Sequence, residues 1–269
     1  YLFGRSILTE QHQIRRFVGY CPQHNALEGL LTCREHLRMY GRIKGVPRGD
    51  LEAQIDGLLA DLALERFAHK QARQLSGGNQ RKLCVAIAMI GAPQMVLLDE
   101  PSSGMDAGSM RALWAVIRRR TTDCCTILTT HSMEECEALC SRIGVMVDGA
   151  LRCLGPIQSL KSRYGQGYKL DVRLAPTSSA SADDVTRAVA DGCPGAKLEE
   201  AELPMVTLTI PQQGAKLADI FTHLALVRER CGVQEASLSQ CTLEQIFLLM
   251  ASKRAQGARA SQSEDAGAE

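Results

Sequence analysis

The stretch from Gln74 to Asp106, QLSGGNQRKLCVAIAMIGAPQMVLLDEPSSGMD, limits the fold more than any other part of the chain. It starts with a glycine pair before a helical pattern and later contains four apolar residues in a row, Met95 to Leu98. An uninterrupted apolar run of this length predicts a strand buried on both faces of a parallel sheet, with helices as crossover connections. The stretch therefore predicts an α/β fold.

Both ends of this stretch carry groups that suit a nucleotide. Ser76 can cap the following helix, and Gly77 and Gly78 let a phosphate approach the main-chain amides at the positive end of the helix dipole. Asp99 and Glu100 follow the apolar strand at its carboxyl end, where open α/β sheets bind ligands. Asp99 is placed to hold Mg²⁺, and Glu100 to orient or deprotonate an attacking water. A lone SGG or a lone DE pair is more often a helix cap or a strand end, so the prediction depends on their combination.

Composition excludes several other classes of protein. The 269 residues are enough for one large or two ordinary domains. A formal net charge of +1 gives no global field that would attract nucleic acid or anionic lipid. The sequence has no apolar run of about eighteen residues that could span a membrane. Its eleven cysteines are scattered without paired ligand spacing, so we expect reduced thiols rather than disulfides or a zinc site.

Local patterns predict the elements of a first domain over residues 1–165, with a helical subdomain over about 30–90. Thr32 with Glu35 has the spacing of a capping box, which predicts a helix through about Tyr40. Ser132 with Glu135 repeats that spacing before a second, short helix. Strands are predicted over 1–3, 14–20, 95–98, 126–130 and 143–147, helices over 51–62 and 112–117, and a hairpin turn at 148–149 before a strand over 150–154.

A second, smaller α+β domain of split βαβ type is predicted over residues 166–250, where the strands become shorter and more alternating. Thr242 with Gln245 has capping spacing for its last helix, 243–250. The tail 251–269 is rich in Ala, Ser, Gln and Gly and is predicted to be disordered. The other predicted elements are strands over 168–174, 206–210 and 234–238 and helices over 183–190 and 217–228.

Four motifs in this order resemble the nucleotide-binding domain of ATP-binding cassette (ABC) transporters. They are CPQ at 21–23, LSGGNQRKL at 75–83, LLDEPSSGMD at 97–106 and THS at 130–132. GYCPQHNAL, EPSSGMD and SLSQCTLEQIFL resemble the A subfamily more narrowly, whose members are mainly lipid exporters. The resemblance covers about residues 1–250. It implies a P-loop NTPase-type parallel sheet with a helical subdomain, followed by a small regulatory domain.

The resemblance implies a catalytic role for four residues. Gln23 would contact Mg²⁺ and the attacking water, and Asp99 would be the Mg²⁺ carboxylate. Glu100 would be the general base, and His131 would contact the γ-phosphate of ATP. Taken alone, a glutamine after proline is usually a polar loop residue, and a strand-end histidine is usually a hydrogen-bonding surface or core residue.

The resemblance also implies contacts with a partner. Ser76, Gly77 and Gly78 would grip the γ-phosphate of an ATP held by a second nucleotide-binding domain in a head-to-tail dimer. Asp106, in the D-loop, would cross the dimer interface, although by itself it is a helix N-cap. Transmembrane domains would handle the lipid substrate, the cassette would lie at the cytoplasmic face of a membrane, and no nucleic acid would be bound.

One family motif does not occur in the sequence. The phosphate-binding loop GxxxxGK[ST] is absent from the 269 residues, as is the aromatic residue expected to stack on adenine. In the family that loop precedes Gln23 by several tens of residues, so we expect it just upstream of Tyr1. We interpret the sequence as an N-terminally truncated fragment of an ATP hydrolase, inactive by itself. Two alternatives stay open: a soluble cassette ATPase of translation or DNA repair, and a non-catalytic cassette that lends only its signature loop.

Overall fold

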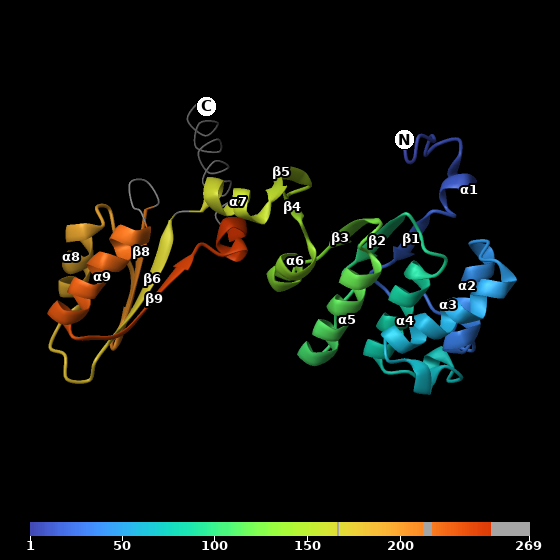
Figure 1. The fold of residues 1–269 in the computed structure, drawn as a ribbon, viewed down its shortest axis with the longest axis horizontal. Helices are drawn as coiled ribbons and strands as arrows, with labels where there is room; N and C mark the ends of the chain where they lie inside the picture. The colour runs from blue at the N-terminus through green and yellow to red at the C-terminus, as the bar shows by residue number, and fades with distance from the viewer. Residues whose placement is uncertain (166, 212–216, 249–269) are drawn as a thin grey trace, which may run out of the picture. The chain divides into compact units, whose positions relative to one another are not determined.

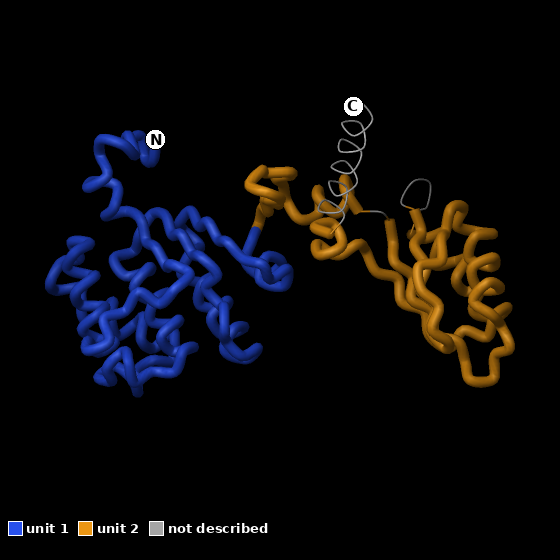
Figure 2. Tube along the Cα trace, turned by 180° about the vertical axis from the view of Figure 1, so that it is seen from behind, with its two compact units in different colours: residues 1–140 blue, residues 141–269 orange. Residues whose placement is uncertain are grey.

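A computed structural model describes residues 1–165, 167–211 and 217–248, so the predicted tail lies outside the described residues. The chain divides into two compact units, residues 1–140 and 141–269 (Figure 2). The domain boundary predicted at residue 165 stays a prediction.

The first unit is built on a three-stranded parallel sheet in the order β1-β2-β3 (Figure 1). These strands are Val18–Cys21, Met95–Asp99 and Cys125–Thr129. The parallel pairing confirms the predicted α/β fold. The helices of this unit are α1 Gln11–Ile14, α2 Cys33–Ile43, α3 Arg48–Asp61, α4 Gly77–Met89, α5 Ala107–Arg120 and α6 Met133–Leu139, with short 3-10 turns η1 Glu65–Phe67 and η2 Ala72–Gln74.

The two faces of this sheet differ in burial. Val96 and Leu98 of β2 are buried in a core shared with α4, whereas the neighbouring Leu97 is only half-buried. Leu97 pairs with Tyr20 and Ile127, whose side chains are exposed. The prediction that 95–98 is buried on both faces is therefore wrong for this unit, because the helices of the described chain cover one face of β2.

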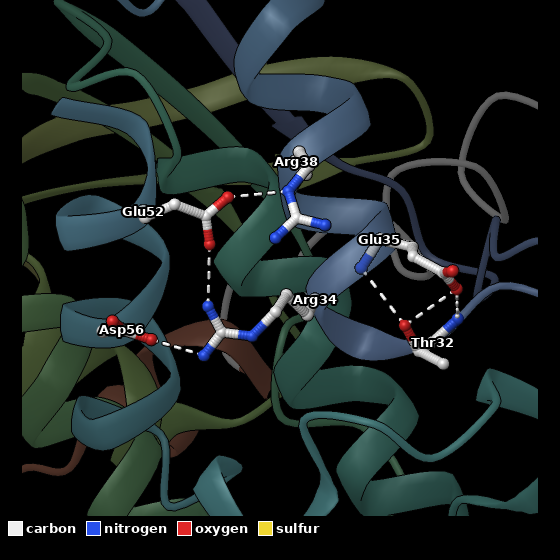
Figure 3. Close-up of polar contacts among 6 residues, drawn as sticks. All are labelled: Thr32, Arg34, Glu35, Arg38, Glu52 and Asp56. Atoms are coloured by element: carbon white, nitrogen blue, oxygen red, sulfur yellow. Dashed lines mark hydrogen bonds and ion pairs between the residues drawn. The ribbon is translucent and has the colours of Figure 1, made fainter. Parts of the chain in front are cut away.

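The helical region of the first unit begins with the predicted capping box. The Glu35 amide donates to Thr32 Oγ1 at 3.2 Å, and the Thr32 amide donates to Glu35 Oε2 at 2.8 Å (Figure 3). Helix α2 is joined to α3 by Arg34, which bridges Glu52 at 2.9 Å and Asp56 (Figure 3). The predicted apolar face of α3 and its end is buried: Leu51, Ile55, Leu58, Leu59 and Leu62.

Three predictions for the first 150 residues need correction. Residues 1–3 form no strand: Leu2 and Arg5 make an isolated bridge around a turn. The strand predicted over 14–20 starts later, at Val18, because residues 11–14 form one helical turn, α1. The alternation of strands and helices up to 143–147 predicts that this last strand joins the parallel sheet; within the described residues, β4, Arg142–Val147, pairs with β5 instead.

The second unit starts with the predicted hairpin. Strands β4 and β5, Ala150–Pro156, are antiparallel and joined by Asp148 and Gly149, both with positive φ (49° and 73°). That pair of conformations is the one a two-residue hairpin turn requires, and Asp-Gly supplies it at low cost. Helix α7, Ile157–Tyr164, follows.

The rest of the second unit is an antiparallel sheet in the order β7-β8-β6-β9 with helices α8 and α9 packed against it (Figure 1). This order and the β-α-β-β-α-β succession agree with the predicted split βαβ type. Residues 243–248 are helical and start at the predicted cap, where the Thr242 amide donates to Gln245 at 2.9 Å; 249 and 250 lie outside the described residues. The elements are β6 Tyr168–Leu174, α8 Ala182–Gly192, β7 Lys197–Glu202, β8 Met205–Ile210, α9 Leu217–Cys231 and β9 Val233–Gln240.

Strand β7 was not expected from the sequence. Its residues, KLEEAE, are all exposed and carry little β-propensity. It forms because its main chain pairs with β8 at the edge of the sheet, where charged side chains can point to water. In the described part of the chain no helix is long and apolar enough to cross a membrane.

Candidate functional site

The candidate site lies at the carboxyl ends of β2 and β3 in the first unit. The Glu100 amide donates to the Thr129 carbonyl at 2.9 Å, which extends the pairing of the two strands by one residue. His131 Nδ1 lies 3.2 Å from Glu100 Oε1, and the Thr129 hydroxyl donates to Asp99 Oδ1. The structure thus brings Asp99, Glu100 and His131 together at the edge of the parallel sheet where β2 and β3 end.

Glu100 has an unusual main-chain conformation. Its φ is 46°, in the left-handed region that non-glycine residues seldom occupy. Its carbonyl accepts from the Ser103 amide at 3.1 Å, so a tight turn starts directly at the end of β2. Such conformations are held by the surrounding structure and cluster at functional sites. Here the turn directs the chain away from the sheet while the Glu100 carboxyl group stays at the strand end beside His131, which is exposed.

Arg81, a buried arginine that the sequence analysis missed, supports this site through hydrogen bonds to main-chain carbonyl oxygens. Arg81, on the first turns of α4, is 3% exposed, which is rare for arginine. Its guanidinium connects two separate segments, the loop after β1 and the end of β2. The sequence carries no local signal for this role, because Arg81 stands among the polar residues Asn79, Gln80 and Lys82. Its acceptors are main-chain carbonyl oxygens: Gln23 at 3.1 Å, Glu100 at 2.9 Å, Pro101 at 3.2 Å, and Pro22 and Asp99.

Gln23 belongs to the first of those segments. Its side chain is exposed, and its carbonyl is held by Arg81, so the main chain of Gln23 is tied to the same guanidinium as Asp99 and Glu100. The structure therefore connects Gln23 to the carboxylate pair through the main chain.

The predicted signature loop forms the N-terminus of α4. Ser76 is the N-cap, and its hydroxyl accepts from the Asn79 amide at 3.4 Å. A Cβ added to Gly77 would meet nothing within 4 Å, and one added to Gly78 would meet only the Met105 side chain at 4.0 Å. Neither glycine has a positive φ. Packing and backbone conformation within the described residues thus give no reason for this glycine pair, and the surface above it is open to a ligand.

Asp106 is the N-cap of α5. Its Oδ1 accepts from the Ser109 amide at 2.9 Å, and this bond is the main reason why the pKa of the Asp106 carboxyl group lies below its usual value. The Ser76 and Asp106 side chains bond within their own helix caps in the described residues, apart from the Glu100–His131 group. That arrangement is compatible with contacts to a partner, which stay a prediction.

Of the capping box predicted at Ser132 and Glu135, one bond forms and the reciprocal side-chain bond does not. The Glu135 amide donates to Ser132 Oγ at 3.2 Å, as in a box, but the Glu135 carboxyl group points into the protein. Its Oε1 accepts from Ser102 Oγ at 2.7 Å and from Trp114 Nε1 at 2.9 Å, and Glu135 is 1% exposed. Two donors in the core compete successfully with the local amide.

Two protein families match separate parts of the chain. A family described as ABC transporter matches residues 2–103, and one described as ABCA1-like, C-terminal R1 regulatory domain, matches residues 165–240. The chain contains an ABC transporter domain and an ABCA1-like R1 domain. All the candidate site residues except His131 and Asp106 fall inside the matched part of the ABC transporter domain.

Curated relatives are similar over almost the whole chain. It is 42% identical over 262 residues to human ATP-binding cassette sub-family A member 2 and 42% identical over 250 residues to human phospholipid-transporting ATPase ABCA3. It is 40% identical over 258 residues to the bovine retinal-specific phospholipid-transporting ATPase ABCA4. These matches cover 92–97% of the chain but only 11–15% of the relatives' lengths.

Solved structures confirm the fold of the ABC transporter domain. An ATP-binding subunit of an ABC transporter aligns with a TM-score of 0.55 at 23% identity, covering 60% of this chain and 68% of the other. A dimeric ATP-binding cassette in a post-hydrolysis state, bound to ADP and Pi, aligns with a TM-score of 0.50 at 24% identity, covering 54% and 65%.

Proposed function

We propose that this chain is the ATP-hydrolysing domain, with its R1 regulatory domain, of an ABC transporter of the A subfamily that moves lipid across a membrane. The contact of 3.2 Å between His131 Nδ1 and Glu100 Oε1, at the ends of two parallel strands, carries the proposal. The names of relatives at 40–42% identity, which are phospholipid-transporting ATPases, support the lipid substrate.

The reaction would be transfer of the γ-phosphoryl group of ATP to water. Such catalysis is mostly positioning and electrostatic stabilisation. Glu100 would hold and deprotonate the attacking water, and His131, across the 3.2 Å contact, would orient the Glu100 carboxyl group and contact the γ-phosphate. The left-handed turn at Glu100 keeps its carboxyl group at the strand end without help from a flexible loop.

The residues present fit Mg²⁺ as a partner of ATP. Within the described residues no three His, Cys, Asp or Glu side chains form a metal cluster. Mg²⁺ at nucleotide sites is bound by one or two protein groups, with phosphates and waters as the other ligands. Asp99, oriented by the Thr129 hydroxyl, would hold it, with Gln23 near the water. When bound, Mg²⁺ would neutralise charge on the phosphate oxygens.

A second cassette would complete each site. The open glycine pair Gly77 and Gly78 and the cap Ser76 would bind the γ-phosphate of ATP held by the partner domain, and Asp106 would lie at the interface. The solved ATP-binding cassette of similar fold is a dimer bound to ADP and Pi, which supports this arrangement. Each cassette would then contribute Glu100 to one ATP and its α4 N-terminus to the other. The transporter would present both cassettes at the cytoplasmic face of its membrane.

The test is Glu100→Gln in the whole transporter. The amide cannot accept the proton of water, so we expect ATP turnover to fall by at least about a hundredfold, with ATP-bound closed dimers retained. Exposed Glu134→Gln is the matched control and should keep the wild-type rate. Turnover by Glu100→Gln at the wild-type rate would remove Glu100 from the role of base. A wild-type protein that binds ATP in trans but never hydrolyses it would support the non-catalytic alternative.

A further inference from the structure

We infer that Glu135 is a positioning residue that sets the distance between His131 and Glu100. It does so from inside the protein, by tying the helix after His131 to the loop after Glu100. The role deepens the proposed function and is separate from the implied role of any motif residue.

The Glu135 carboxyl group is the centre of a buried network. One oxygen, Oε1, accepts from Ser102 Oγ at 2.7 Å and from Trp114 Nε1 at 2.9 Å. Glu135, Ser102 and Trp114 are 1%, 7% and 8% exposed. A carboxyl group so far from water is stable only where donors meet it, and here the two donors come from two other segments.

The helix that carries Glu135 depends on this network for its position. Helix α6 has seven residues, and Glu135 is the one among them that is buried. The apolar contact of α6 with the core comes from the half-buried Leu139 at its far end, so Glu135 supplies the fully buried contact near His131. Ser132, its N-cap, directly follows His131, so any shift of α6 moves His131 as well.

The network and the candidate site bridge the same two segments. Ser102 lies two residues after Glu100, and Glu135 lies four residues after His131, in the first turn of α6. The Ser102–Glu135 bond and the His131–Glu100 contact therefore form two parallel links, one buried and one exposed. Two links fix a relative orientation that one exposed contact would leave free to pivot.

Trp114 adds a third segment to this frame. It lies on α5, whose N-cap is Asp106, so the turn between Ser102 and Asp106 is held at both ends. A displacement of that turn would be transmitted to α6 through Oε1 of Glu135. The buried carboxyl group thus couples the predicted interface residue Asp106 to the position of His131.

The first experiment needs no ATP. Trp114 is the single tryptophan of the chain, so its indole N–H gives one nuclear magnetic resonance signal in the 269-residue protein. The His131 ring signal, assigned with His131→Gln, is recorded at the same fixed pH. We expect Glu135→Ala to shift both signals and to speed hydrogen exchange of the indole N–H. Glu135→Gln should restore both, because its amide oxygen can accept the same two bonds.

The same two signals serve for the control variant and for the outcome that would overturn the inference. Glu134→Ala, on the exposed side of α6, should leave both signals unchanged. An unchanged His131 signal in Glu135→Ala, with a shifted indole signal, would show that Glu135 only packs Trp114 and would overturn the inference. If Glu135→Ala does not fold, Ser102→Ala removes one hydroxyl group of the same network and must shift the His131 signal in its place.

The second experiment rests on the proposed function. In the transporter, Glu135→Ala should lower kcat about tenfold, corresponding to about 1.4 kcal/mol of transition-state stabilisation, with the KM for ATP within about twofold. Glu135→Gln should recover most of the lost kcat. A raised KM with unchanged kcat would overturn the positioning role. Turnover by Glu100→Gln at the wild-type rate would instead remove Glu100 from the role of base in the proposed function, and the His131 signal would still decide the role of Glu135.

Discussion

The guanidinium of Arg81 holds together the two segments that carry Gln23 and the carboxylate pair, so its removal should loosen the site from within. Arg81→Met keeps the aliphatic stem but removes the donors to five main-chain carbonyl oxygens. A hydrogen bond contributes about 1 kcal/mol net, and a buried acceptor left without a donor costs about 1–3 kcal/mol. Water can reach the exposed Gln23 segment, so we expect a loss of about 3–5 kcal/mol rather than the full sum.

The assay is urea unfolding of the 269-residue chain followed by tryptophan fluorescence. Trp114, the single tryptophan, lies in the first unit and reports the stability of the unit that contains Arg81. Lys82→Met, the neighbouring residue on α4, is the matched control because it removes the same charge from a half-buried position. Arg81→Lys keeps the charge but not the planar fork and should recover only part of the loss.

The outcome separates two explanations. Equal unfolding midpoints for Arg81→Met and Lys82→Met would refute the reasoning, because they would show that the carbonyl contacts contribute nothing. Full recovery by Arg81→Lys would show that charge alone matters, and not the geometry of the fork.

Three further predictions concern other parts of the first unit. Gly19→Ala should destabilise it by about 2–4 kcal/mol in the same unfolding assay, because the new Cβ would lie 1.9 Å from a carbonyl oxygen of α4; a stable variant would show that β1 and α4 can separate. Burial raises the pKa of Cys21 to about 12, so its thiol should stay protonated and resist alkylation at pH 8 while exposed Cys125 reacts, as peptide mass mapping would show. The Arg38 guanidinium lowers the pKa of Glu52 by donating a hydrogen bond to its carboxylate. The pair therefore stabilises the fold above the usual glutamate pKa, and this contribution is lost as the pH falls through the lowered pKa. In thermal unfolding, Arg38→Gln should lower the free energy of unfolding by at most about 1 kcal/mol at pH 7 and by less at pH 3.

Sequence patterns determined most of the elements because their signals are local. The capping box at Thr32 and Glu35, the apolar periodicity of α3 and the Asp148–Gly149 turn each depend on residues a few positions apart. The sequence also placed Asp99 and Glu100 at the end of one strand and His131 at the end of another, and the parallel sheet brings these two ends to one edge.

Other features were decided by contacts between distant segments. Ser132 and Glu135 have the same spacing as Thr32 and Glu35, yet the Glu135 carboxyl group turns to Ser102 and Trp114, which lie 33 and 21 residues away. Strand β7 exists because β8 offers it an edge, and not because its own residues favour a strand. Arg81 has no local pattern that reveals its five acceptors, which lie in the loop after β1 and at the end of β2.

The sequence by itself therefore determined most of the elements and the chemical groups they deliver, because helix caps, turns and apolar periods act over a few residues. The tertiary structure alone decided how those groups are held. A buried donor or acceptor must find its partner wherever the fold provides one, and for Arg81 and Glu135 those partners lie on other segments.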